Sequence, residues 1–159
     1  MSMKFLDTWT PQSLSSEATT FPAEMYTSEE IYRLEQRLIF GETWYYVGHI
    51  SQLQGAGSYF TVEIAQQPLV ILKNQAGELR GFFNVCSHRA APVAVGSGKS
   101  HCLTCLYHAW SFDLEGNLKG IPAAGYSKAN SIGGAIVPVD CLPAARWEPT
   151  YFRNSLCGT

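Results

Sequence analysis

Apolar residues divide the chain into a polar start, one amphipathic stretch and a series of short apolar runs. Residues 1–25 are rich in Ser, Thr and Pro and are expected to form an irregular arm. Thr27 and Glu30 have the spacing of a capping box, which predicts a helix over about 27–41 that ends at Gly41. The apolar face of this helix consists of Ile31, Leu34, Leu38 and Ile39.

Beyond Trp44 the apolar runs are short and rich in β-branched and aromatic residues, with Gly, Pro and Asn between them. This pattern predicts antiparallel strands. The predicted strands are 44–50, 59–64, 69–73, 79–85 and the two arms of 110–121. The residues Asn-Gln-Ala-Gly at 74–77 favour a hairpin between the third and fourth strands. After Pro122 the chain is rich in Ala, Gly and Pro, and its pattern assigns no element. The expected fold is therefore mainly antiparallel β with one N-terminal helix.

Composition narrows the class of protein. A chain of 159 residues with 46% hydrophobic residues can form one globular domain. A net charge of −2 without a cluster of Lys and Arg does not suit a nucleic-acid surface. No apolar run is long enough to span a bilayer, and the first residues do not resemble a signal peptide. Five widely spread cysteines suit a reducing compartment better than a disulfide framework, so a cytoplasmic protein is expected.

Two short segments carry metal-ligating residues. Cys86 and His88 lie in the first segment, Cys105 and His108 lie in the second, and 16 residues separate His88 from Cys105. Each segment follows a predicted strand. Two loops at one end of a small sheet would therefore present two thiols and two imidazoles to one site.

This donor set is compatible with two kinds of metal centre. A single zinc ion accepts two cysteines and two histidines in a tetrahedron. A [2Fe–2S] cluster can instead bind two thiolates on one iron and two imidazoles on the other. Because each segment supplies one Cys and one His, each loop would reach both irons, and the spacing favours the cluster. A structural zinc module remains the alternative.

The spacing Cys-x-His-x16-Cys-x2-His and the sequences around it, NVCSHRAAPVAVGSG and CLTCLYHAWSFDLEGNLKGIP, resemble the Rieske domain of ring-hydroxylating oxygenase α subunits. The resemblance extends over 26–147, and 148–159 is expected to be a divergent tail. It implies a Rieske-type antiparallel β fold, with Cys86, His88, Cys105 and His108 as ligands of a [2Fe–2S] cluster.

The resemblance also implies a function. In these oxygenases the cluster receives electrons from a ferredoxin or flavin reductase and passes them to a mononuclear Fe(II) in a second, C-terminal domain, where O₂ is activated. Such an iron needs two histidines and a carboxylate. Only His49 and His101 remain in this chain, and neither resembles that motif. We therefore expect an α subunit, of a monooxygenase or dioxygenase, cut short before its catalytic domain. This chain would relay electrons and have no catalytic residue of its own; a stand-alone Rieske ferredoxin is the alternative.

Three positions differ from the residues that are usual in the sequence motif of this family. Ala90 and Ala109 stand where glycine is usual, and Leu106 stands where proline is usual. An alanine in place of glycine needs either a negative φ or room for a methyl group. The cluster is expected to bind nonetheless, because none of the three is a ligand.

High-potential Rieske proteins provide a further comparison. They place hydroxyl donors at the positions of Trp110 and Phe112, and a disulfide that clamps the loops at the positions of Ala91 and Tyr107. Neither feature is present here. The comparison therefore implies a reduction potential at the low end of the Rieske range.

The remaining candidates are expected to be structural. His49 lies in a predicted strand, and Cys102 is interpreted as a strand residue although it forms a Cys-x2-Cys pair with Cys105. Cys141 and Cys157 have no histidine nearby and are interpreted as ordinary thiols. Arg89 could dock an acidic electron donor or pair with a local carboxylate.

Overall fold

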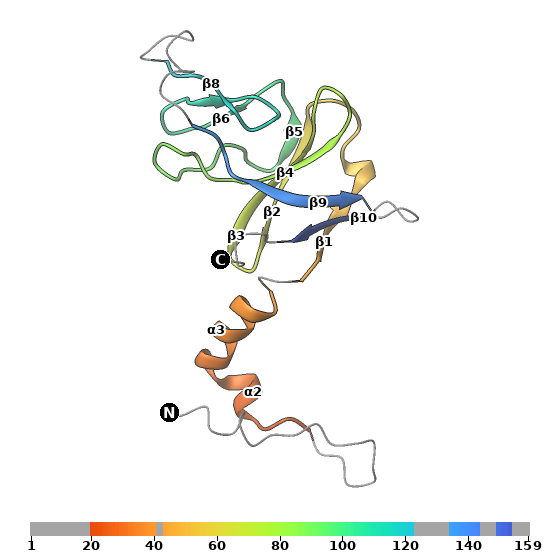
Figure 1. Ribbon diagram of the computed structural model, residues 1–159, viewed down its shortest axis with the longest axis vertical. Coiled ribbons are helices and arrows are strands. Elements are labelled where there is room, and N and C mark those ends of the chain that lie inside the picture. The colour runs from red at the N-terminus through yellow and green to blue at the C-terminus, as the bar shows by residue number, and fades with distance from the viewer. Residues whose placement is uncertain (1–19, 41–42, 123–133, 144–148, 154–159) are drawn as a thin grey trace. The chain divides into compact units, whose positions relative to one another are not determined.

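The computed structural model describes residues 20–40, 43–122, 134–143 and 149–153 (Figure 1). Side chains are described up to residue 139, and only the backbone is described for 140–143 and 149–153. The chain forms two compact units, which divide after Leu34. The first unit holds the helix α2 (Glu24–Thr27) and the start of α3 (Glu29–Leu38). Among the described residues, no helix has the length and apolar character needed to cross a membrane.

The predicted helix exists, but its start differs from the expectation. Thr27 is not the N-cap, because it ends α2 and its hydroxyl donates to the carbonyl of Ala23 at 3.1 Å. Ser28 takes the capping role, accepting from the backbone N–H of Ile31 at 3.4 Å. The expected stop at Gly41 lies outside the described residues. Of the predicted apolar face, Ile31 is buried.

The second unit is built on a seven-stranded sheet with a three-stranded sheet at one end (Figure 1). The order in the large sheet is β1-β10-β9-β4-β3-β2-β5, and every described pairing is antiparallel. Its strands are β1 (Tyr45–His49), β2 (Ser58–Ile64), β3 (Gln67–Lys73), β4 (Leu79–Phe83), β5 (Ser97–Lys99), β9 (Pro138–Pro143) and β10 (Pro149–Arg153). A 3-10 helix, η1 (Ile50–Gln52), follows β1.

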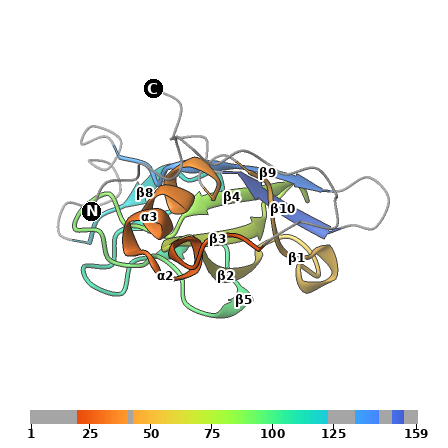
Figure 2. The ribbon, with the colours of Figure 1, turned by 90° about the horizontal axis from the view of Figure 1, so that it is seen from below.

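Strand β3 lies between β2 and β4 and is buried on both faces (Figure 2). Because successive side chains of a strand point to opposite faces, the run Leu-Val-Ile-Leu contributes to two hydrophobic cores. Val70 and Leu72 belong to the first core, which also contains Cys86 and Cys105. The second core, on the other face, contains Leu69, Ile71, Val47, Leu53, Phe60, Phe83 and Val139. The continuous apolar run is thus the signature of a strand without a solvent face.

The small sheet consists of β6 (Leu103–Thr104), β7 (Ser111–Phe112) and β8 (Leu118–Gly120). Phe112 is fully buried in the first core. Gly116 lies in the turn between β7 and β8 with a φ of +89°, and it approaches the ring of Phe82 in β4. This close approach, which only a residue without a side chain allows, joins the small sheet to the large one.

The mainly antiparallel β fold is confirmed, as is the hairpin of β3 and β4 around 74–77. The strands expected at 44–50, 59–64, 69–73 and 79–85 correspond to β1 to β4. Strands β5, β9 and β10 were not predicted. A strand was expected before the second loop and is β6, but Cys102, interpreted as a strand residue, lies just before it in a bend. β5 and β6 have three and two residues, too few for a periodic pattern. β9 and β10 depend on distant partners, since β10 pairs with β1 across about a hundred residues of sequence.

We predict that Gly116→Ala lowers the free energy of unfolding by about 2–4 kcal/mol, because it adds a steric clash to backbone strain. The new methyl carbon would lie 2.5 Å from Cε1 of Phe82. Gly77→Ala is the matched control, since Gly77 has a φ of +82° but no atom within 4 Å of the added carbon. It should lose only about 1 kcal/mol from strain. Urea unfolding measures both, and equal losses would contradict the close packing.

Candidate metal centre

The two ligand loops are closed by the same pair of backbone hydrogen bonds. In the first loop, the N–H of Ala90 donates to the carbonyl of Cys86 at 2.9 Å, and the N–H of Cys86 donates to the carbonyl of Ala91 at 2.8 Å. In the second loop, the N–H of Ala109 donates to Cys105 at 2.9 Å, and the N–H of Cys105 donates to Trp110 at 2.9 Å. Each cysteine therefore opens a turn that closes five residues later. The two turns differ in the position of the histidine, which lies two residues after Cys86 in the first and three residues after Cys105 in the second.

Both turns contain an alanine in the left-handed conformation. The φ angle is 55° at Ala90 and 55° at Ala109. Of the two alternatives expected for an alanine here, a negative φ is not found, and the methyl groups are instead accommodated in a backbone that favours glycine. Both side chains are exposed, which gives the methyl groups room. The cost is backbone strain of about 1–2 kcal/mol at each position.

Asn84, which the sequence analysis did not single out, fixes the first loop at its base. Its side chain is buried and makes three hydrogen bonds across the loop. The amide nitrogen donates to the carbonyl of Ala94 at 2.8 Å. The side-chain oxygen accepts from the N–H of Val93 at 2.9 Å and of Ala94 at 3.0 Å. The sequence feature that could have identified it is a polar residue at the end of an apolar strand, two residues before Cys86, because a buried polar side chain must find hydrogen-bond partners.

The two cysteines lie together inside the first core. Cys86 and Cys105 are each 2% exposed, and their thiols interact. Burial is the main reason why the pKa of the Cys86 thiol is raised, while hydrogen bonds from backbone N–H groups of His88 and Arg89 act in the opposite direction. Backbone N–H donors of this kind would also stabilise a metal-bound thiolate.

The two histidines lie together at the surface. The ring centroids of His88 and His108 are 4.7 Å apart, in a T-shaped arrangement, and both side chains are exposed. The indole of Trp110 stacks on His88 with a centroid distance of 4.6 Å and an interplanar angle of 5°. The pKa of His108 is lowered by desolvation and then by the positive charges of His88 and Arg89. A lowered pKa favours the neutral imidazole, which is the form that binds a metal.

The structure therefore groups the four predicted ligands as a cysteine pair and a histidine pair. Within the described residues, no set of three or more Cys, His, Asp or Glu side chains converges on one metal ion. This arrangement fits two irons, one facing the thiols and one facing the imidazoles, better than a single tetrahedral ion.

The other candidates have local contacts outside the two pairs. His49 caps η1, accepting from the N–H of Ser51 at 3.2 Å, which agrees with a structural role. His101 is exposed, with its Nδ1 3.4 Å from the amide nitrogen of Gln75. The sulfur of Cys102 lies 3.8 Å from the hydroxyl of Thr104. Cys141 and Cys157 lie outside the residues whose side chains are described.

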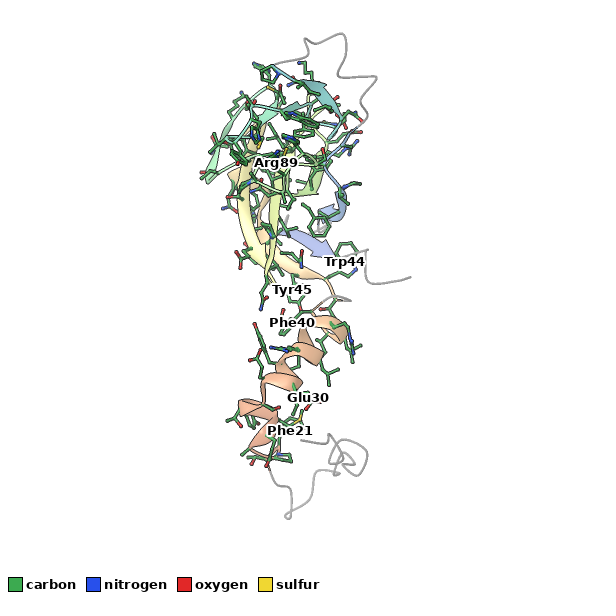
Figure 3. The ribbon with its side chains drawn as sticks, turned by 90° about the vertical axis from the view of Figure 1, so that its left-hand side faces the viewer. Phe21, Glu30, Phe40, Trp44, Tyr45 and Arg89 are labelled. Carbon is green, nitrogen blue, oxygen red and sulfur yellow. The ribbon has the colours of Figure 1, made fainter. Side chains whose placement is uncertain are left out.

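Arg89 is exposed beside the histidine pair, at the end of the unit that carries the loops (Figure 3). Among the side chains that the structure describes, it takes part in no salt bridge, whereas Arg33 and Arg80 do. Local pairing with a carboxylate, one of its two expected roles, is therefore not found in this part of the chain.

The antiparallel fold and its two loops are those of a Rieske-type iron–sulfur domain. Residues 43–139 match the family described as the Rieske [2Fe–2S] domain, and the chain belongs to this family. Membership implies binding of a [2Fe–2S] cluster, and the cysteine and histidine pairs fit that group.

The chain is similar to oxygenase subunits. It is 41% identical to the carnitine monooxygenase oxygenase subunit of Escherichia coli (strain K12) over 103 residues, 64% of this chain and 28% of that protein. It is 30% identical to the benzene 1,2-dioxygenase α subunit of Pseudomonas putida, covering 81% of this chain and 26% of that protein.

One solved structure similar to this chain is that of a quaternary ammonium Rieske monooxygenase, described as giving insight into carnitine oxidation by gut microbiota and inter-subunit electron transfer. It has a TM-score of 0.75 and 33% identity, and the match covers 86% of this chain and 37% of that one. The chain thus spans about a quarter to two fifths of the length of these relatives. The resemblance to the Rieske domain of oxygenase α subunits is confirmed.

We predict that Ala90→Gly and Ala109→Gly each raise the free energy of unfolding by about 0.5–1 kcal/mol, because glycine removes the strain of a positive φ. Ala91→Gly is the control. Ala91 is not among the residues with a positive φ and packs against the first core, so its replacement should destabilise the chain. Thermal unfolding followed by circular dichroism ranks the variants. A loss of stability in both loop variants would show that the methyl groups make contacts worth more than the strain.

Proposed function

We propose that Cys86, His88, Cys105 and His108 bind a Rieske-type [2Fe–2S] cluster, and that the domain relays electrons in a Rieske oxygenase. The observation that carries this proposal is the separation of the ligands into a buried thiol pair and an exposed imidazole pair. A Rieske cluster has that asymmetry, with thiolates on one iron and imidazoles on the other.

The surroundings of the site suit electron transfer. When bound, the cluster supplies a one-electron couple. The first core surrounds both cysteines and keeps water away from their sulfurs. The two imidazoles lie at the surface, so a redox partner that docks there comes within a short distance of the metal site. Electron entry and exit are therefore expected on the histidine side.

The proposed partners follow from the relatives and from charge. The electron donor is a ferredoxin or flavin reductase, and the acceptor is a mononuclear Fe(II) oxygenase domain. Arg89 places a positive charge beside His108, which suits an acidic surface on the donor. The relatives named above are oxygenase subunits, which favours the oxygenase assignment over a stand-alone Rieske ferredoxin.

Catalysis of oxygenation is not assigned to this chain. Its two remaining histidines are both exposed: His49 ends β1 and His101 lies between β5 and β6, and each has the local contacts described above. They do not form the two-histidine, one-carboxylate site that O₂ activation by non-haem iron requires. The substrate would be chosen elsewhere in the whole protein.

We predict that the anaerobically purified chain is red-brown and contains iron and acid-labile sulfide in a 1:1 ratio, as a [2Fe–2S] cluster requires. Cys86→Ser and Cys105→Ser should abolish the colour. Cys102→Ser is the matched control and should retain it, because the Cys102 side chain contacts Thr104 and does not belong to the core that contains Cys86 and Cys105. A colourless protein with one tightly bound zinc ion would overturn the proposed function.

We further predict a reduction potential below about +100 mV, within a Rieske range of roughly −150 to +300 mV. Hydroxyl donors to the cluster raise the potential by stabilising the reduced state. Phe112 has no donor, and the hydroxyl of Ser111 lies 3.4 Å from the carbonyl of Gly120, to which it donates. Protein-film voltammetry at pH 7 measures the potential. Phe112→Tyr should raise it, and a wild-type value above about +100 mV would refute the hydrogen-bond argument.

A further inference from the structure

The histidine side of the site contains a contact that joins the two ligand loops. Trp110 belongs to the second loop, and His88, on which its indole lies flat, belongs to the first. Residues 88 and 110 are far apart in sequence, so the stack connects segments that the backbone does not hold together locally. A contact of this kind can fix both the distance between the loops and the plane of the imidazole.

Trp110 is fixed within the second loop by its backbone and by its side chain. Its carbonyl accepts the hydrogen bond from the N–H of Cys105 that closes the second turn. Its partly buried side chain packs against the first core, the same core that contains both cysteines. The indole is thus a fixed surface, and the exposed imidazole of His88 rests on it.

His88 needs such a support. Metal-bound histidines are usually oriented by a hydrogen bond from the second ring nitrogen. Within the described residues, no hydrogen bond fixes the ring of His88, and its contacts are aromatic. The stack with Trp110 is nearly parallel, at 5°, whereas the contact with His108 is T-shaped, at 63°. The parallel stack covers one face of the His88 ring with the indole.

The aromatic neighbour of His108 differs in kind. The rings of Tyr107 and His108 have centroids 3.8 Å apart, but the two residues are adjacent in the same loop. Tyr107 is 60% exposed and is not packed on the core. Its contact cannot tie one loop to the other, so it provides a natural comparison for the stack across the loops.

We propose that Trp110 is a positioning residue that clamps the two ligand loops through its stack on His88. This inference rests on the proposed function, since the imidazole that it orients is a proposed ligand. The clamp is non-covalent, and it joins the first loop at His88 to the second loop at Trp110. It acts on the retention of the cluster and on the environment of the iron that the histidines bind.

The test compares Trp110→Leu with Trp110→Phe in the purified, cluster-loaded chain. Both replacements are apolar and similar in size, but only phenylalanine keeps a planar ring for the stack. Two readouts are used: the rate at which visible absorbance bleaches in excess ferrous chelator, and the electron paramagnetic resonance spectrum of the reduced cluster. Far-ultraviolet circular dichroism checks the fold of each variant.

We expect Trp110→Leu to lose its cluster roughly threefold to tenfold faster than the wild type, with shifted g values, and Trp110→Phe to lie between them. Tyr107→Leu, the control, should stay within about twofold of the wild type, because it removes only the contact within one loop. Equal rates and spectra for the Leu and Phe variants would overturn the clamp, since the ring would then not matter. A Phe variant that holds no cluster would also overturn it.

Failure of the proposed function would be distinguishable from failure of the clamp. A wild-type chain that held zinc instead of iron and sulfide would refute the cluster. In that diamagnetic protein the stack would still be measurable by proton nuclear magnetic resonance. The ring protons of His88 would show an upfield shift from the indole, and Trp110→Leu would remove it. Absence of that shift would refute the stack itself.

Discussion

The packing of β3 against both cores is the interaction on which the rest of the second unit depends. Its residues alternate between the two faces of the large sheet, so one strand supplies Val70 and Leu72 to one core and Leu69 and Ile71 to the other. The first of these cores extends under the small sheet and contains both cysteines. The proposed metal site is thus attached to β3, whose residues Leu69 to Leu72 are fully buried.

On the proposed function, this attachment would couple metal binding to folding. The two cysteines occupy core positions, where an ordinary thiol behaves as a small apolar residue and resists ionisation. A metal bound there would change that balance, because it would bind the thiolates and link two loops that are about twenty residues apart in sequence. Asn84 and the backbone hydrogen bonds that close each turn shape the loops without using the side chains of the four proposed ligands.

Sequence patterns predicted the longer strands of the large sheet and the two loops that carry Cys and His. The short apolar runs, rich in β-branched and aromatic residues, located β1 to β4, and the spacing of Cys and His located both loops. The patterns could not locate β9 and β10, whose pairing depends on residues far away in the chain. They also could not show that Ala90 and Ala109 keep a positive φ, because an alanine by itself favours the opposite. The stack of Trp110 on His88 depends on how two loops meet, which no local pattern records.

The two loops share one backbone turn but place their histidines differently, so the shape of a loop and the position of its histidine are separate properties. Both loops have the same closing hydrogen bonds and the same left-handed residue, so the shape of the backbone does not distinguish them. The histidine occupies the third residue of one turn and the fourth residue of the other. The direction in which each imidazole points therefore depends on which residue of the shared turn carries it. A ligand can be redirected by moving it one place along the turn while the turn itself stays the same, and the two halves of the site can diverge in chemistry without diverging in fold.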